Sequence, residues 1–195
     1  MEALAKLVNE GLNCGAEVLT QMLEAEIKME TPSIQLLEKR GLISKITTSD
    51  IGSLAVVEMG FAGKLNGNSG LIFDKDSAWQ FVEKVAGEDT GSEEFDFISA
   101  GVLTEIGNIV LNRVLGAISN ALSLNLDYVV PTFFQGDVER LWRNTDADAS
   151  EITGVVARTH FKVADMATNG TIVLFFDQSS YKILSDLIKS ANLTD

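Results

Sequence analysis

The sequence predicts an α+β fold in which one continuous, mostly antiparallel sheet of about six strands is covered by long helices. Two observations support this prediction: helix-like and strand-like patterns alternate along the chain, and the same order of elements occurs twice. With 195 residues, of which 46% are hydrophobic, the chain is also long enough to bury a substantial apolar core.

The first copy reads helix, strand, hairpin, helix. In order, its predicted elements are a helix at 3–24, a strand at 26–30, a turn or strand at 33–37, a loop or short helix at 38–50, hairpin strands at 51–61 and 71–73 around turn residues at 64–70, and a helix at 74–86. Pro32 is expected to end the first strand, and Asp74 is expected to cap the last helix. The polar stretch 87–94 is a linker candidate.

The second copy repeats this order. Its predicted elements are a helix at 97–123, a strand at 126–130, an unassigned segment at 132–149, strands at 152–163 and 171–176, and a helix at 179–191. Aligning Pro32 with Pro131 gives an offset of 131 − 32 = 99 residues, which also aligns Asn9 with Asn108. We therefore interpret the chain as a single domain, 1–195, made of two pseudo-symmetric repeats at about 1–87 and 97–195.

Charge and composition exclude several classes of function. The formal net charge of -13 argues against nucleic acid or an anionic membrane as a partner, because both attract positive surfaces. One cysteine, Cys14, and one histidine, His160, provide neither a disulfide nor a Cys/His zinc site. The N-terminus lacks a basic region followed by an apolar core, so we expect a cytoplasmic protein.

The long helix of the second repeat places a carboxylate and a carboxamide on one face. Glu105 and Asn108 are three residues apart, and side chains at that spacing are neighbours on a helix. At the offset of 99 the first repeat has Lys6 and Asn9 instead. A structural requirement common to both repeats would not replace a carboxylate by an ammonium group. We therefore expect a functional pair that is complete only in the second repeat.

These residues carry a resemblance to a known family. Glu105-Ile-Gly-Asn108 is followed, after 22 intervening residues, by Pro131, and the Asn and Pro of this frame recur at Asn9 and Pro32. In this pattern the chain resembles the CheC, CheX and FliY family of response-regulator phosphatases from bacterial chemotaxis, over nearly its whole length. The family usually has Asp or Ser at the position of Gly101, and its two-site members carry a second Glu and Asn pair, which Lys6 breaks.

The resemblance implies a hydrolase that removes the aspartyl phosphate of a CheY-like response regulator in chemotaxis or a related two-component pathway. The protein would need no cofactor of its own, because the regulator would supply the Mg²⁺. Asn108 would position the attacking water, and Glu105 would pair with a lysine of the regulator. The alternative is a non-catalytic binding module that docks a response regulator, a CheD-like protein or a flagellar switch component. Both a monomer and a homodimer are compatible with the sequence.

Structural explanations compete with these roles. Asn108 and Asn9 could bond to each other across the pseudo-two-fold, which would explain why both repeats have an asparagine there. Glu105 could be an ordinary solvated carboxylate. Asn112, with its counterpart Asn13, is expected to be structural. Trp142, beside two arginines, is a candidate for a partner surface.

Overall fold

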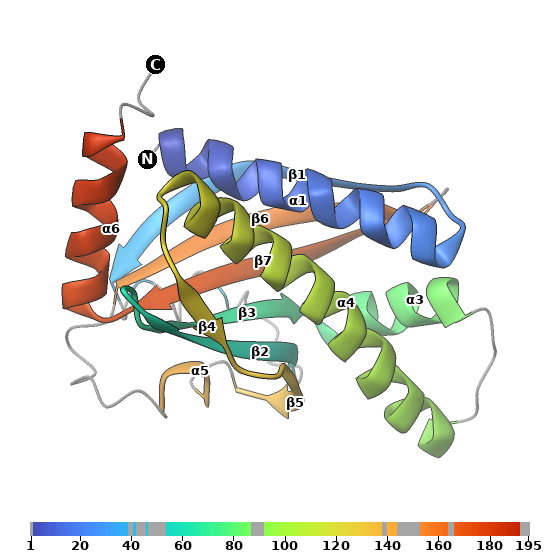
Figure 1. Cartoon of the computed structure of the whole chain (residues 1–195). Helices are drawn as coiled ribbons and strands as arrows, with labels where there is room; N and C mark the ends of the chain where they lie inside the picture. The colour runs from blue at the N-terminus through green and yellow to red at the C-terminus, as the bar shows by residue number, and fades with distance from the viewer. Residues whose placement is uncertain are drawn as a thin grey trace.

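The computed structural model describes residues 2–38, 41, 46, 54–86, 92–137, 140–143, 153–163 and 166–191. Its helices and strands are α1 (Glu2–Leu23), β1 (Ile27–Glu38), β2 (Leu54–Gly63), β3 (Gly67–Phe73), α3 (Lys75–Ala86), α4 (Ser92–Ala121), β4 (Leu126–Tyr128), β5 (Thr132–Gly136), α5 (Arg140–Arg143), β6 (Thr153–Val163), β7 (Met166–Phe176) and α6 (Gln178–Ser190) (Figure 1). Most of the predicted loop at 38–50, residues 87–91 of the linker candidate and the side chain of Trp142 lie outside the described residues, whereas residues 92–94 of the linker candidate form the start of α4.

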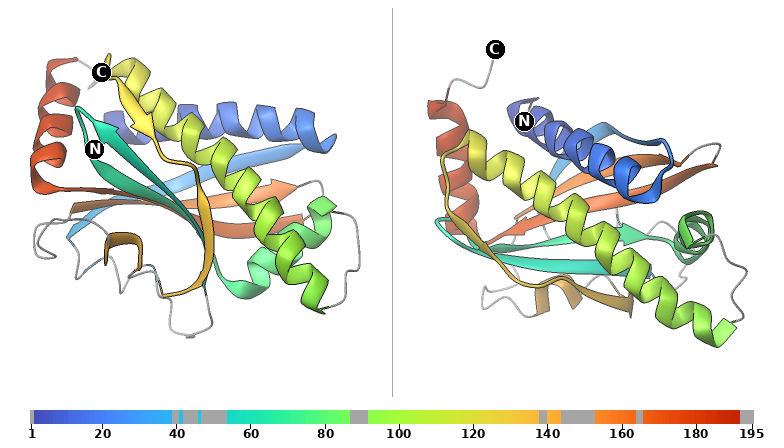
Figure 2. Two further views of the ribbon diagram at one scale, coloured as in Figure 1. Left: turned by 60° about the horizontal axis from the view of Figure 1, so that its bottom comes forward. Right: turned by 45° about the vertical axis from the view of Figure 1, so that its right-hand side comes forward.

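The described strands form one antiparallel sheet in the order β1-β6-β7-β3-β2-β4, with β5 also paired to β2. Because β4 and β5 share one edge of β2, seven strands occupy six positions. The predicted α+β class and the single, mostly antiparallel sheet are therefore confirmed. Two helices, α1 and α4, cross one face of this sheet (Figures 1 and 2).

The sheet is built by an exchange between the two copies. In β1 of the first copy, Ile34 pairs with Ala157 of β6, whereas in β5 of the second copy Phe133 pairs with Val57 of β2. Phe133 lies 133 − 34 = 99 residues after Ile34, and Ala157 lies 157 − 57 = 100 residues after Val57, so the two pairs are equivalent in the duplication. Each copy thus places its edge strand on the hairpin of the other, and the β3–β7 pairing joins the two hairpins at the centre.

Both prolines lie at the same irregularity of an edge strand. The expectation that Pro32 ends the first strand is wrong, because β1 continues to Glu38 with a register shift between Glu30 and Ser33. At the equivalent place, Pro131 lies between β4 and β5. An edge strand tolerates proline at a bulge, since no outer neighbour uses the missing N–H. The chain can therefore pass a proline without leaving the sheet.

Sheet pairing also overrides the local sequence at Gly67. The predicted turn 64–70 ends early, because β3 begins at Gly67 and pairs with both β2 and β7. A Cβ at Gly67 would lie 2.0 Å from the carbonyl oxygen of Phe175, so glycine is needed for close approach rather than for a turn. Similarly, β7 begins at Met166 and not at 171, because its first five residues, which include the polar Thr168 and Asn169, pair with β6.

The two long helices touch through glycines. A Cβ at Gly11 of α1 would lie 2.5 Å from Val114 Cα, and one at Gly15 would lie 3.7 Å from Val110 Cα. At the offset of 99, Gly11 corresponds to Val110 and Gly15 to Val114. The two contacts are therefore related by the pseudo-two-fold, as in an isologous dimer.

The main core lies between the helices and the sheet and accounts for the apolar character of α4. By length and composition, Ile98–Ala121 is apolar enough to cross a membrane. In the fold its apolar side is covered, since Ile106, Val110 and Val114 are 0% exposed in the main core cluster. On its way across the sheet, α4 also comes close to β2, where a Cβ at Gly107 would meet Val57 at 2.4 Å.

A smaller core on the other face of the sheet holds α5. The Asn68 amide donates to Leu141 O at 2.9 Å and to the Glu58 carboxylate, and the Arg140 guanidinium lies 4.5 Å from the centre of the Phe134 ring. The Arg140 side chain thus contacts an aromatic ring of the same chain. Burial raises the pKa of Glu58, against the opposing effects of the Asn68 hydrogen bond and the charge of Arg140.

Replacing Glu58 by Gln is expected to stabilise the protein at pH 7. A raised pKa means that the folded state favours the protonated carboxyl group, so the wild-type side chain costs stability above its folded pKa and regains it as the pH falls. The amide of Gln can still accept from Asn68. Urea unfolding of both proteins at pH 7 and pH 5 should show that the advantage of Glu58→Gln shrinks at pH 5. An advantage of equal size at both values would contradict the assignment.

Candidate functional site

The open face of α4 carries the predicted pair. Its other faces are buried against α1 and the sheet, which leaves Glu105 exposed and Asn108 half-buried on one side of the helix. Asn112 follows one turn later on the same side. A Cβ added at Gly101 or Gly116 would have no neighbour within 4 Å, so the face is open both before and after the pair. Glu105 and Asn108 therefore share a surface that a partner can reach.

Asn112 fixes the orientation of the Asn108 carboxamide. The Asn112 amide donates to the Asn108 backbone oxygen at 2.8 Å and to Asn108 Oδ1 at 2.6 Å. Because a carbonyl oxygen only accepts, the first bond identifies the Asn112 atom as nitrogen, and the second then identifies the Asn108 atom as oxygen. One lone pair of Asn108 Oδ1 is thus occupied, while the Asn108 NH₂ group bonds to no described residue. The carboxamide is held with its donor available.

The first repeat lacks this arrangement. Lys6 and Asn13 are exposed, Asn9 is half-buried, and none of the hydrogen bonds between described residues joins Asn13 to Asn9. Nor does such a bond join Asn9 to Asn108, so the structural alternative of a bond across the pseudo-two-fold is not found in the described part of the chain. The two asparagines have the same position in the repeat but different surroundings.

Glu105 is free to act outside the chain. The ion pairs between described residues do not include it, and its side chain is exposed. One residue earlier, Thr104 Oγ1 donates to Ala100 O at 2.6 Å, which satisfies that hydroxyl group within the helix. Glu105 and the Asn108 NH₂ group are therefore the polar groups that this part of the face offers to a partner.

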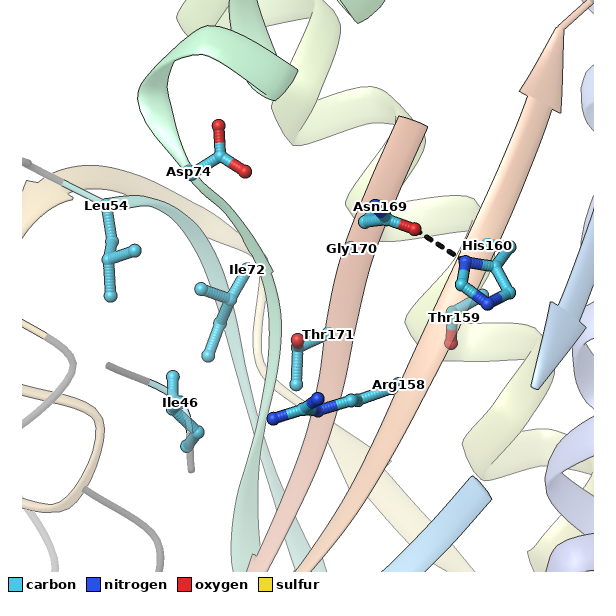
Figure 3. Close-up of a pocket in the computed structure, with 10 residues that line it drawn as sticks. All are labelled: Ile46, Leu54, Ile72, Asp74, Arg158, Thr159, His160, Asn169, Gly170 and Thr171. Atoms are coloured by element: carbon cyan, nitrogen blue, oxygen red, sulfur yellow. Dashed lines mark hydrogen bonds between the residues drawn. The ribbon is translucent and has the colours of Figure 1, made fainter. Parts of the chain in front are cut away.

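The remaining reactive side chains lie elsewhere. Cys14 is exposed on α1, and the described residues contain no cluster of three or more His, Cys, Asp or Glu that could hold a metal. His160 lies on the face of the sheet opposite α4, where its Nδ1 is 2.5 Å from Asn169 Oδ1 beside a cavity of about 320 Å³ (Figure 3). The face of α4 thus offers a carboxylate and an oriented carboxamide, which suit positioning rather than covalent chemistry.

The sequence predicts a structural role for Asn112, and its bond to the Asn108 backbone oxygen agrees with that prediction. Sequence reasoning missed its second bond, which orients the Asn108 side chain. The structure shows that only Asn112 bonds to the preceding asparagine. The spacing of four residues was the available signal, since side chains at i and i+4 meet on a helix.

Comparison with known proteins gives one relative by sequence. No protein-family model matches the chain. Over 137 residues it is 29% identical to the CheY-P phosphatase CheC of Bacillus subtilis (strain 168), a match that covers 67% of this chain and 64% of CheC. The aligned region therefore spans less than two thirds of the length of that relative.

Solved structures share the fold over nearly the whole chain. FliY of Thermotoga maritima has a TM-score of 0.75 at 16% identity, with 98% of this chain and 96% of FliY covered. The FliM middle domain of Vibrio alginolyticus has a TM-score of 0.67 at 14% identity, with coverage of 94% and 99%. CheX, in a CheX-CheY-BeF3-Mg complex from Borrelia burgdorferi, has a TM-score of 0.57 at 21% identity, with coverage of 89% and 99%. The chain is therefore similar in sequence to CheC and shares its fold with FliY, the FliM middle domain and CheX, which supports the resemblance to the CheC, CheX and FliY family.

Proposed function

We propose that this protein is a cytoplasmic phosphatase that hydrolyses the aspartyl phosphate of a CheY-like response regulator in chemotaxis or related two-component signalling. The observation that carries the proposal is the Asn108 carboxamide, oriented by Asn112 beside an unpaired Glu105 on the open face of α4. The first repeat lacks this arrangement, which supports a function carried by the second repeat alone. The relative named as a CheY-P phosphatase and the CheX structure solved with CheY point to the same substrate class.

In this mechanism Asn108 enters the phosphorylated site of the regulator. The remaining lone pair of its Oδ1 accepts a hydrogen bond from water, and its NH₂ group donates to the water or to a phosphoryl oxygen. The water is then held in line with the bond that breaks, as in other phosphoryl transfers. The regulator, as substrate, brings the Mg²⁺ that neutralises the phosphoryl charge. Asn112 keeps the carboxamide from rotating before the partner arrives.

Glu105 sets the position of the partner. Its carboxylate pairs with a lysine of the regulator and so fixes how deeply Asn108 is inserted. An ion pair that becomes desolvated at an interface is worth roughly 1.5 to 7 kcal/mol of coupling, whereas one that stays exposed is worth about 0 to 1 kcal/mol. We expect Glu105→Ala to weaken binding and to slow hydrolysis.

A second candidate is a binding module without catalysis. Among the structures compared, FliY and the FliM middle domain fit the chain with higher TM-scores than CheX does, 0.75 and 0.67 against 0.57. In this function the Glu105 face would dock a regulator, a CheD-like protein or a component of the flagellar switch. The two candidates differ in one respect, since a docking face would still bind its partner after Asn108 is truncated.

The test is the decay of a phosphorylated CheY-like protein from the same organism, with Mg²⁺. Wild-type protein should accelerate the decay, and Glu105→Ala and Asn108→Ala should remove most of the acceleration. If regulators bind but their phosphate decays at its intrinsic rate, the phosphatase function is wrong and the binding module stands.

The first repeat offers a second prediction. Lys6→Glu recreates a Glu and Asn pair on α1, but we expect it to be at least about tenfold less active than the wild-type pair, because Asn13 does not hold Asn9 as Asn112 holds Asn108. In an Asn108→Ala background, Lys6→Glu should therefore restore at most about a tenth of the wild-type rate. Full recovery of activity in the double variant would show that the Asn112 hydrogen bond is dispensable.

A further inference from the structure

Arg113 is a cation on the open face of α4 that the proposed mechanism does not use. It is the one basic residue in the sequence of that helix, and its side chain is exposed. The ion pairs and side-chain hydrogen bonds between described residues do not include it. The whole chain has 15 Lys and Arg against 28 Asp and Glu, so acidic side chains are plentiful. A guanidinium group that pairs with none of those in the described part of the chain is available to a partner.

Arg113 projects from the side of α4 that faces α1. A Cβ added at Gly15 would lie 3.9 Å from Arg113 Cβ, where the two long helices cross (Figure 2). Long side chains of a helix lean toward its N-terminus, so we expect the stem of Arg113 to cover Ile109, which is half-buried one turn earlier. This direction brings the guanidinium group toward the level of Asn108.

A partner that engages the predicted pair would also cover Arg113. Around α4, Glu105 lies between the other two residues, with Asn108 about 60° to one side and Arg113 about 80° to the other. Along the helix axis, Arg113 is about 7.5 Å from Asn108 and about 12 Å from Glu105. A specific complex buries about 800 Å² on each partner, which corresponds to a footprint about 16 Å in radius. A protein domain centred on Asn108 therefore contacts the Arg113 side chain.

The chemistry of the proposed substrate identifies what Arg113 would meet. The receiver domain is the part of the regulator that carries the phosphorylated aspartate. Proteins hold Mg²⁺ with carboxylates, and the phosphoryl group adds further negative charge at the same place. This chain itself has a formal net charge of -13, so two surfaces of like charge would repel each other. A cation inside the footprint offsets that repulsion, whereas Glu105 adds to it unless it is paired.

The duplication provides an internal comparison. At the offset of 99, Arg113 corresponds to Cys14, just as Glu105 corresponds to Lys6. The repeat with the complete Glu and Asn pair thus also has the arginine, and the other repeat has an exposed, neutral thiol there. Because the fold accepts a short side chain at the equivalent place on α1, packing of the crossing does not require arginine on α4.

We propose that Arg113 is an orienting residue of the docking surface, whose guanidinium group pairs with a carboxylate of the receiver domain beside the phosphorylated aspartate. The proposal rests on the proposed function and deepens it, since Glu105 takes a lysine of the same receiver. Two ion pairs of opposite sense, about 12 Å apart along α4, fit the receiver in one orientation and repel it in the reversed one. Arg113 acts on binding and leaves the chemical step to Asn108.

The test measures the affinity for a receiver with and without this cation. The probe is a CheY-like receiver from the same organism, activated with beryllofluoride and Mg²⁺. At low salt, Arg113→Ala should raise its Kd, and KM for the phosphorylated receiver, about fivefold to tenfold, and Arg113→Glu should raise both further. Arg113→Lys should keep most of the affinity, and kcat should stay close to that of the wild type in all three variants.

Salt dependence and a second lysine variant separate a specific ion pair from net charge. Salt screens charge pairs, so the difference in Kd between wild type and Arg113→Ala should shrink as ionic strength rises from about 0.05 to about 0.5 M. Lys6→Ala removes the same charge from the exposed face of α1. From the level of Gly11 beside Val114, Lys6 is roughly 17 Å along α4 from Asn108, which lies beyond the footprint. This control should leave Kd and KM unchanged.

Several outcomes would overturn the proposal. A Kd that is unchanged in Arg113→Ala and Arg113→Glu, or an equal rise in Lys6→Ala, would show that Arg113 makes no specific pair. A fall in kcat with unchanged KM would place the arginine at the reacting groups instead. Failure of the proposed function looks different, since wild-type protein itself would then leave the decay unaffected. In that case Kd still decides whether a bound receiver contacts Arg113, and a wild type that binds no receiver overturns both proposals.

Discussion

Replacement of Asn108 by alanine is expected to lower the rate of regulator dephosphorylation by about 10²- to 10³-fold, or roughly 3 to 4 kcal/mol of transition-state stabilisation. The reason is geometric: the carboxamide is held by Asn112 at 2.6 Å and is available to orient water, and alanine has no group that can replace it. Single-turnover decay of the phosphorylated receiver measures the effect. Because the truncation removes only an orienting group, Kd for the activated receiver should change much less than the rate.

Two asparagine variants serve as controls for this loss. Asn112→Ala frees the Asn108 side chain to rotate, so it should reduce kcat by a smaller factor, on the order of tenfold, with little change in KM. Asn9→Ala removes the equivalent side chain of the first repeat and should leave the rate unchanged. An Asn108→Ala protein that keeps wild-type activity would refute the catalytic assignment. Equal losses in Asn9→Ala and Asn108→Ala would indicate a shared structural role.

Replacement of Gly11 by alanine is expected to cost about 3 kcal/mol of folding stability, which is near the upper end for overpacked sites. The added Cβ would lie 2.5 Å from Val114 Cα and 2.7 Å from the Arg113 carbonyl oxygen. These are backbone atoms of the facing helix, so no side chain can rotate away and α1 must separate from α4. Urea unfolding followed by circular dichroism measures the loss, and alanine's better helix propensity only partly offsets it.

Gly101→Ala is the matched control, because it makes the same chemical change inside a helix. No atom lies within 4 Å of a Cβ at Gly101, so this variant should gain about 0.5 to 1 kcal/mol from helix propensity alone. Gly15→Ala, with a nearest contact of 3.7 Å, should fall between the two. If Gly11→Ala and Gly101→Ala shifted stability in the same direction, the close helix crossing would be wrong.

The sequence predicts those parts of the fold whose patterns are local, such as helix periodicity and caps, or occur in both repeats. Apolar periodicity placed α1, α3 and α6 within one or two residues of their observed bounds, and Asp74 caps α3 as predicted, with its carboxylate accepting from Ser77 N at 2.7 Å. The comparison of Lys6 with Glu105 also predicts that only the second repeat carries a functional pair, and this stays a prediction. These features follow from local chemistry or from the internal repeat.

The features that were not predicted depend on tertiary partners. Pro32 ends a strand in most local contexts, yet β1 continues past it because the outer edge of this strand needs no donor. Gly67 resembles a turn residue, but β7 draws it into the sheet. Asn112 and Asn13 share their identity and their position in the repeat, and only the three-dimensional contacts show that Asn112 orients a neighbouring asparagine. That catalysis takes place at Asn108 stays a prediction.

The glycines at the helix crossing explain why the repeat without Glu105 persists. Gly11 of α1 lies so close to Val114 of α4 that two copies of α4 could not take the same arrangement, because valine would stand where only glycine fits. The second repeat therefore cannot replace its partner with another copy of itself. At this crossing the two repeats play different parts, since α4 supplies the valines and α1 supplies the glycines that receive them. The first repeat is therefore indispensable as the other half of the fold, whether or not its exposed face has a function of its own.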